Sequence, residues 1–154
     1  MTLFARVDPW TLPTLDRVLT PPERRLFLTM TPADQRHSLD LGERLRRDGH
    51  DDADLLCAAL LHDVGKATGP LPIGYRVVYS IVAMIAPSAA RWLGRPKPTA
   101  LRYPFYLAAH HPDIGAAAAA EAGSNPRVVR LISGHSRPGP DALSQALYCY
   151  DRQM

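Results

Sequence analysis

Side chains that can bind a metal ion or transfer a proton recur along this chain of 154 residues. The most informative are two neighbours, His62 and Asp63, which directly follow the apolar residues Leu60 and Leu61. The imidazoles and carboxylates that could join them are His37, His110, His111, His135 and Asp151. Both kinds of group bind divalent cations and act as general acids or bases. The pattern therefore indicates metal-ligand chemistry assembled from distant segments.

The segments that must position these groups are predicted to be helices. Thr20 and Thr31 each precede a proline and, three positions on, an acidic residue, which is typical of a first helical turn. From caps, glycines and apolar periodicity we expect helices at about 22–30, 32–48, 52–63, 74–85, 99–109, 113–122, 126–133 and 141–150. No run of four to eight residues alternates as a strand would. The sequence predicts an all-α fold, a compact bundle of about seven to nine short helices.

Helix geometry says which groups can meet. His37 is spaced i, i+4 and i+8 with Leu41 and Leu45, so its imidazole should face the core, as a ligand or as a satisfied core histidine. His62 and Asp63 diverge by about 100° around a helix, so they can share an ion only if it lies between them. A carboxylate near a helix C-terminus is disfavoured by the helix dipole unless a cation compensates. Asp63 is therefore expected to lie beside a cation.

The order of a His, a His-Asp pair and a distant Asp resembles the HD superfamily of metal-dependent phosphohydrolases. The resemblance covers roughly Thr31 to Arg152. It implies an HD-domain fold, with metal ligands at His37, His62, Asp63 and Asp151. At this length we expect one domain spanning 1–154, with a helical extension at 1–30 and a metal-binding core at 31–152.

A second part of the resemblance concerns members that bind two metals, among them the HD-GYP phosphodiesterases. The segment from His111 to Gly115 is similar to their His-x-x-x-Gly segment, and His135 lies where they have a further histidine. The resemblance implies that Asp63 bridges two ions and that His111 and His135 hold the second. The chain has Gly-His-Ser at 134–136 instead of His-His-Glu, and it lacks the Gly-Tyr-Pro signature. These departures count against cyclic-dinucleotide hydrolysis but leave the superfamily resemblance intact.

The expected cofactor is one or two divalent metal ions. Imidazole and carboxylate donors favour Fe or Mn, with Zn, Ni and Mg as alternatives. The expected activity is hydrolysis of a small phosphorylated substrate, a nucleotide or a phosphodiester, by attack of a metal-bound hydroxide. Asp63 would orient the water and shuttle its proton, while Lys66 would contact a phosphate oxygen.

Each assignment has a structural alternative. These are helix-dipole compensation for Lys66, a surface or capping role for His110 and His111, a loop position for His135, and a surface ion pair with Arg152 for Asp151. His110 could otherwise touch a substrate phosphate. The chain as a whole could be a non-catalytic, metal-stabilised helical binding or signalling module. An enzyme is favoured because every position of the defining motif is present.

The charge distribution is uneven along the chain. No acidic residue lies between Asp63 and Asp113, whereas that stretch holds the basic residues Lys66, Arg76, Arg91, Arg95, Lys97 and Arg102. Such a stretch could attract anionic substrates, or it could be a solvated basic surface. The segment 91–97 interleaves basic and aromatic residues, so a nucleic-acid or membrane-surface partner is a third interpretation. It matches no nucleic-acid-binding module, and we expect no stable nucleic-acid partner.

Composition sets the remaining expectations. With 46% hydrophobic and 21% charged residues the chain is an ordinary globular protein. Cys57 and Cys149 are expected to be buried thiols in a reducing compartment, and no signal peptide is visible in the first twenty residues. The apolar stretch 77–90 is shorter than the roughly 20 residues of a membrane span, so a cytoplasmic location is expected. Residues 77–86 are apolar all round, which suggests a core helix, a homo-oligomer interface or the wall of a substrate pocket.

Overall fold

The computed structural model describes residues 12–69, 73–96, 99 and 101–154. Within these ranges the fold is all-α, as predicted, with nine α-helices, one 3₁₀ helix and no strand. The elements are α1 (Leu12–Val18), α2 (Pro21–Phe27), α3 (Pro32–Arg47), α4 (Ala53–Leu61), η2 (Val64–Thr68), α5 (Ile73–Ile85), α6 (Pro87–Leu93), α7 (Tyr103–Glu121), α8 (Pro126–Gly134) and α9 (Ala142–Asp151). The helices at 32–48, 126–133 and 141–150 were predicted to within one or two residues.

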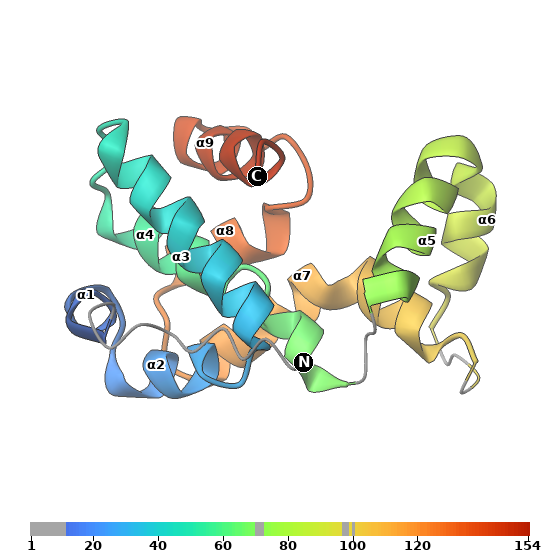
Figure 1. Cartoon of the computed structure of the whole chain (residues 1–154), viewed down its shortest axis with the longest axis horizontal. Coiled ribbons are helices and arrows are strands. Elements are labelled where there is room, and N and C mark those ends of the chain that lie inside the picture. The colour runs from blue at the N-terminus through green and yellow to red at the C-terminus, as the bar shows by residue number, and fades with distance from the viewer. Residues whose placement is uncertain (1–11, 70–72, 97–98, 100) are drawn as a thin grey trace, which may run out of the picture.

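Helix α4 is the centre of the fold. Asp52 caps it by accepting hydrogen bonds from the backbone N–H groups of Asp54 and Leu55, both at 3.0 Å. Every residue from Leu55 to Leu61 is buried, which only a helix covered on all sides can achieve. Figure 1 shows α3, α8 and α9 gathered around α4, with α7 running beneath. The His-Asp pair thus follows the most buried helix of the chain.

Glu23 ties the amino-terminal helices to this body. Its Oε2 accepts hydrogen bonds from Thr20 N and Thr20 Oγ1, both at 2.8 Å, and the first of these belongs to a capping box. Its Oε1 accepts from Ser124 Oγ at 2.6 Å and from Cys57 Sγ at 3.5 Å. Burial works to raise the pKa of Glu23, but these hydrogen bonds lower it. One ionised carboxylate therefore joins α2, α4 and the loop after α7.

Helix α7 departs from the prediction of two separate helices at 99–109 and 113–122. It runs unbroken from Tyr103 to Glu121 and contains Pro112. A proline has no N–H to donate to the carbonyl four residues back, which here belongs to Ala108. The His111 side chain bonds that carbonyl instead, with Nδ1 2.9 Å from Ala108 O. The helix continues because a side chain replaces the missing backbone donor.

The α5–α6 hairpin carries residues 77–86, for which a core helix, a homo-oligomer interface and a pocket wall were the expected alternatives. It stands apart from the body and packs on the first half of α7, where the Tyr75 and Phe105 rings lie 5.2 Å apart (Figure 1). Val77, Val78 and Ile81 are about half exposed, so α5 is not a core helix. Pro87 starts α6 as a separate helix, because proline fits a first turn better than a helix interior.

Two smaller findings complete the comparison. Cys57 is buried as expected, and burial raises the pKa of its thiol, but Cys149 is exposed because it lies on the outer face of α9. Between the expected helices, residues 70–72 and 97–98 lie outside the described residues. No described helix is both long and apolar enough to cross a membrane.

Candidate metal centre

The six predicted ligand residues meet in one place, although they come from six different elements. The residues are His37 in α3, His62 and Asp63 at the junction of α4 and η2, His111 in α7, His135 at the end of α8, and Asp151 at the end of α9. Three groups have ligand atoms that all lie within 4.8 Å of one another: His37 with His62 and Asp63, His62 with His135 and Asp151, and Asp63 with His111 and His135. The donor set and its crowding fit a site for divalent cations.

The first half of the cluster centres on Asp151. Its Oδ1 lies 2.9 Å from His37 Nε2 and 3.2 Å from His62 Nε2. His62 Nε2 is in turn 3.5 Å from Asp63 Oδ2. Two carboxylates and two imidazoles therefore surround one small region, and the four residues are those that the resemblance gave as the defining ligands.

The second half lies on the other side of Asp63. Asp63 Oδ1 is 3.6 Å from His111 Nε2 and 3.9 Å from His135 Nε2, and these two nitrogens are 3.2 Å apart. Asp63 Oδ1 thus faces His111 and His135, whereas Oδ2 faces His62 and the Lys66 ammonium. This arrangement suits a carboxylate that contacts two cations at once.

Hydrogen bonds to backbone carbonyls orient three of the imidazoles. The Nδ1 atoms of His62, His111 and His135 lie 2.9, 2.9 and 2.7 Å from the carbonyl oxygens three residues earlier in each chain segment. A carbonyl only accepts, so each Nδ1 carries the proton and each neutral ring keeps its lone pair on Nε2. All three Nε2 atoms point into the cluster and are ready to bind a metal.

This tautomer leaves the nitrogens without suitable protein partners. His62 Nε2 is completely buried and has no hydrogen-bond partner among the described residues. In neutral His111 and His135, two nitrogen lone pairs face each other at 3.2 Å, which is repulsive unless a positive charge lies between them. Buried polar atoms are nearly always satisfied in folded proteins. A cation would satisfy all three nitrogens, so the residues present fit a metal site.

Helix ends reinforce the preference for positive charge. His62 and His135 are the C-cap residues of α4 and α8, and Asp151 is the last residue of α9. The carboxyl end of a helix carries the negative end of its dipole and unpaired carbonyl groups. Three such ends converge on the cluster, so the backbone itself stabilises cations there.

The protonation states agree with this electrostatic picture. Burial, foremost, lowers the pKa of His111 to about 3 and that of His135 to about 4, so both rings are neutral at pH 7. Burial opposes ionisation of Asp63, but the positive charges at His62 and Lys66 hold its pKa well below the usual range. Burial would also lower the pKa of His62, yet Asp63 and Asp151 together raise it. Without a cation, the two carboxylates therefore favour a proton on His62 Nε2, in the place that a bound cation would take, so the neutral form of this ring belongs to the metal-loaded site.

Lys66 and His110 occupy different places. Lys66 Nζ forms an ion pair with Asp63 Oδ2 at 2.6 Å, one turn after the His-Asp pair, so it borders the cluster. His110 Nε2 lies 2.7 Å from the carbonyl oxygen of Gly94, and its ring lies 4.5 Å from that of Tyr106. It links α7 to the end of α6. This geometry does not support a phosphate contact for His110.

Two glycines permit the cluster to close, Gly65 in η2 and Gly115 in α7. Gly115 is the glycine of the segment that resembles the family's His-x-x-x-Gly motif. A Cβ on Gly65 would lie 2.7 Å from Gly115 N and 2.8 Å from His111 C, which is closer than real Cβ atoms come. Their shared contact brings η2 against α7, and so Asp63 against His111. In the sequence, the sign of this contact is the glycine two residues after the His-Asp pair.

Other candidates do not join the cluster. Arg102 lies over the Trp92 ring, with Cζ 5.1 Å from the ring centroid, and donates to Trp92 O at 3.1 Å. Among the described lysines and arginines between Asp63 and Asp113, only Lys66 forms an ion pair with a residue of the cluster.

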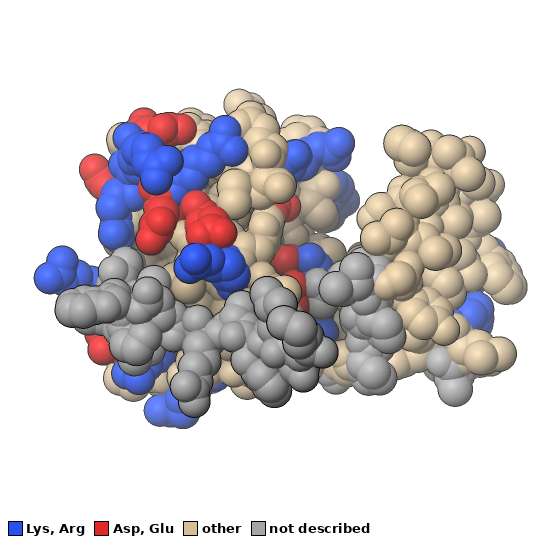
Figure 2. Space-filling view, viewed as in Figure 1, with Lys and Arg blue, Asp and Glu red and all other residues tan. Residues whose placement is uncertain are grey.

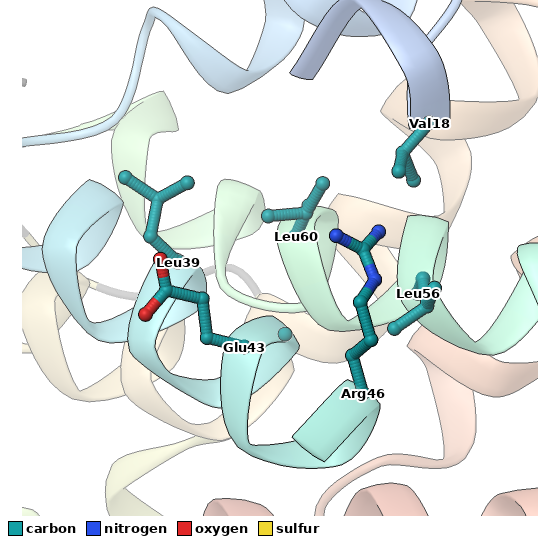
Figure 3. A pocket seen from close by; sticks show the side chains of 7 residues that line it. Val18, Leu39, Glu43, Arg46, Leu56 and Leu60 are labelled. Atoms are coloured by element: carbon teal, nitrogen blue, oxygen red, sulfur yellow. The ribbon is translucent and has the colours of Figure 1, made fainter. Parts of the chain in front are cut away.

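A pocket lies between α1, α3 and α4, and Figure 3 shows its leucines turned inward. It is lined by Val18, Leu39, Gly42, Glu43, Arg46, Leu56 and Leu60. It shares no residue with the cluster.

Comparison with known proteins agrees with the geometry. The family model described as HD domain matches residues 35–152, which include all six clustered residues and Lys66. No curated protein and no solved structure matches the chain. Families of this kind bind divalent metals through His and Asp residues, and the described structure gathers such residues at one point. The chain belongs to the HD domain family, within the superfamily of metal-dependent phosphohydrolases.

Proposed function

We propose that this protein hydrolyses a small phosphorylated substrate, a nucleotide or a phosphodiester, with two divalent cations. The observation that carries the proposal is the position of Asp63, whose Oδ1 faces His111 and His135 while its Oδ2 faces His62 beside Lys66. His37, His62 and Asp151 would hold one cation with Asp63, and His111 and His135 would hold the other. Mn or Fe suits these nitrogen and oxygen donors best.

The cations would supply a water of lowered pKa and polarise the phosphoryl oxygen. The neutral Nε2 atoms would hold them, since the backbone already fixes the proton of each ring on Nδ1. Asp63 stays ionised because of its lowered pKa, so it can accept a hydrogen bond from the attacking water and orient it. The same low pKa makes it a weak base, and orientation is its main contribution.

Lys66 would stabilise the negative charge of the phosphoryl group. Its ammonium lies 2.6 Å from Asp63 Oδ2 and its side chain is about one-fifth exposed, so it borders the cluster and remains reachable. A lysine is a mobile point charge that can follow a phosphate oxygen as charge develops. The competing role is to neutralise Asp63 in a protein that uses the cluster only for stability.

The first experiment counts metal ions by mass spectrometry in protein purified without a chelator or a histidine tag. We expect two ions in the wild type, fewer than two in His111→Ala and none in Asp63→Ala. His110→Ala is the matched control, because that neighbouring imidazole bonds Gly94 O and lies outside the cluster. An equal loss in His110→Ala and His111→Ala would contradict the site, as would failure to load with Mn or Fe.

The second experiment tests catalysis with the same preparations. Metal-loaded protein is assayed on a panel of nucleotides, phosphodiesters and phosphomonoesters, with and without chelator. Lys66→Gln should keep its ions and lose roughly 10- to 100-fold in kcat, by the loss of one charged contact to the transition state. If the loaded wild type hydrolyses nothing and Lys66→Gln binds metal more tightly, the binding-module alternative is correct.

A further inference from the structure

The α5–α6 hairpin exposes more apolar surface than the rest of the described chain would lead one to expect. Most of the large apolar side chains on it face solvent: Val77 (51%), Val78 (48%), Ile81 (47%), Met84 (76%), Ile85 (70%) and Trp92 (52%). We call these six residues the hairpin patch. Monomeric soluble proteins rarely leave such contiguous apolar areas open unless they bind something.

The patch follows the helix geometry of α5. Its five α5 members are spaced i, i+1, i+4, i+7 and i+8 from Val77, which places them on one face. The opposite face is the one that packs, where Tyr79 and Val82 are partly buried and Tyr79 Oη approaches Gly94. The larger apolar residues are therefore turned away from the body. Nothing in the metal centre requires this arrangement.

Charge distinguishes the tip of the hairpin from its base. Residues 73–95 contain three arginines and no acidic residue, and residues 77–90 at the tip carry no charge at all. In Figure 2 the hairpin is an almost uniformly uncharged lobe beside a body covered with both signs of charge. Arg91 and Arg95 are exposed on the returning side. At 1.5 Å per residue, Arg91 lies roughly 6 Å back from Pro87 along the axis of α6, and Arg95 follows the end of that helix at Leu93.

We propose that the hairpin docks on an anionic lipid surface. Apolar residues of interfacial helices enter roughly 5–10 Å into the boundary between headgroups and acyl chains. With Met84 and Ile85 at that depth, Arg91 and Arg95 would lie at the level of the lipid phosphates, and Trp92 would lie at the interface that tryptophan favours. The apolar tip and the basic residues behind it thus complement the two layers of an anionic membrane.

The same charges disfavour a second copy of the chain as the occupant. Two hairpins packed tip to tip by a two-fold axis would bring arginines together, with no acidic residue in 73–95 to pair with them. A phosphate-bearing surface neutralises these arginines directly. The proposal does not depend on the hydrolytic activity, because the patch shares no residue with the metal centre.

The test is co-sedimentation of the full chain with vesicles of phosphatidylcholine alone and of phosphatidylcholine mixed with phosphatidylglycerol. The wild type should bind the mixed vesicles, with or without chelator. The double substitution Met84→Asp and Ile85→Asp should weaken binding by about a hundredfold, since each buried side chain of this size contributes roughly tenfold or more. Leu28→Asp is the matched control, because Leu28 is 46% exposed but lies after α2 in the body.

Further variants separate the charge from the apolar contact. Arg91→Gln and Arg95→Gln should each weaken binding about fivefold at low salt, and the difference should shrink at high salt. All variants should unfold at the wild-type temperature, because the substituted side chains are exposed. Equal binding to neutral and anionic vesicles, or unchanged binding by the double variant, would overturn the proposal. So would a dimer that the double variant abolishes, in a protein that ignores vesicles.

Discussion

Gly65→Ala probes how the backbone brings the two halves of the metal centre together. Gly65 follows Asp63 by two residues, and its Cα faces the backbone of α7 at His111 and Gly115. An added methyl group would lie 2.7 Å from Gly115 N, 2.8 Å from His111 C and still closer to His111 O. Backbone atoms cannot rotate away as a side chain can. The 3₁₀ helix η2 and α7 must therefore separate by on the order of 1 Å.

The expected magnitude follows from overpacking. Extra volume in a packed core lowers the free energy of unfolding by about 1–3 kcal/mol. Because the added methyl group meets backbone atoms of both His111 and Gly115, we expect a loss of about 3 kcal/mol. For a chain of this length, that corresponds to a decrease in Tm of roughly 6–12 °C. Metal sites tolerate ligand displacements of only about 0.2 Å. A shift of His111 away from Asp63 should therefore remove the second ion.

The assay combines thermal unfolding with metal content and includes two glycine controls. Gly115→Ala adds a methyl group 3.1 Å from Gly65 N and 3.3 Å from Val64 Cγ1, a tight but milder contact, so its effect should be smaller. Gly74→Ala has nothing within 4 Å and lies in α5, where alanine should stabilise the helix by about 0.5–1 kcal/mol. If Gly65→Ala keeps two ions and unfolds within about 2 °C of the wild type, the close-approach argument is refuted.

Three further outcomes are expected. Pro112→Ala gives the helix a backbone N–H that competes with His111 Nδ1 for the Ala108 carbonyl oxygen. The affinity for Mn²⁺, measured by calorimetry, should therefore fall about 10- to 100-fold. An unchanged affinity would show that this hydrogen bond does not orient the His111 ring. Glu23→Gln should lose about 1–3 kcal/mol of unfolding free energy in urea at pH 7. Because hydrogen bonds such as that from Ser124 outweigh burial and lower the pKa of Glu23, its stabilisation is present above about pH 4.3 and is lost as the pH falls further, so the gap between the two proteins should narrow in acid. In metal-free protein, the pKa of His111 is about 3 in the folded state and about 6.5 in the unfolded state, so the unfolded state takes up the proton first as the pH falls. The wild type should therefore lose stability relative to His111→Gln between pH 6.5 and pH 3. Curves of unfolding free energy against pH that run parallel for the two proteins would contradict this.

Much of the secondary structure was predictable because its signals are local. Thr31 caps α3 as expected, and Asp52 and Asn125 cap α4 and α8 close to the expected starts of those helices; each accepts hydrogen bonds from the first turn. The prediction failed at Pro112, where a break was expected and the His111 side chain compensates the missing donor. It also left open where residues 77–86 would lie. Apolar periodicity gives the face that seeks burial, but it does not say whether another element covers that face.

The candidate site also combines features that the sequence indicates with features that only the packing of helices determines. The residue types indicated divalent metal chemistry, and the resemblance to the HD superfamily implied the ligands His37, His62, Asp63, His111, His135 and Asp151. The sequence by itself could not show that Asp63 lies between His62 on one side and His111 on the other, because its orientation depends on the contact of η2 with α7. It also could not show that three carbonyls fix the protons on Nδ1, or that three helix ends converge. Ligand chemistry is a property of side chains, whereas the distances between them are set by packing among helices far apart in the chain, and only the tertiary structure decides these.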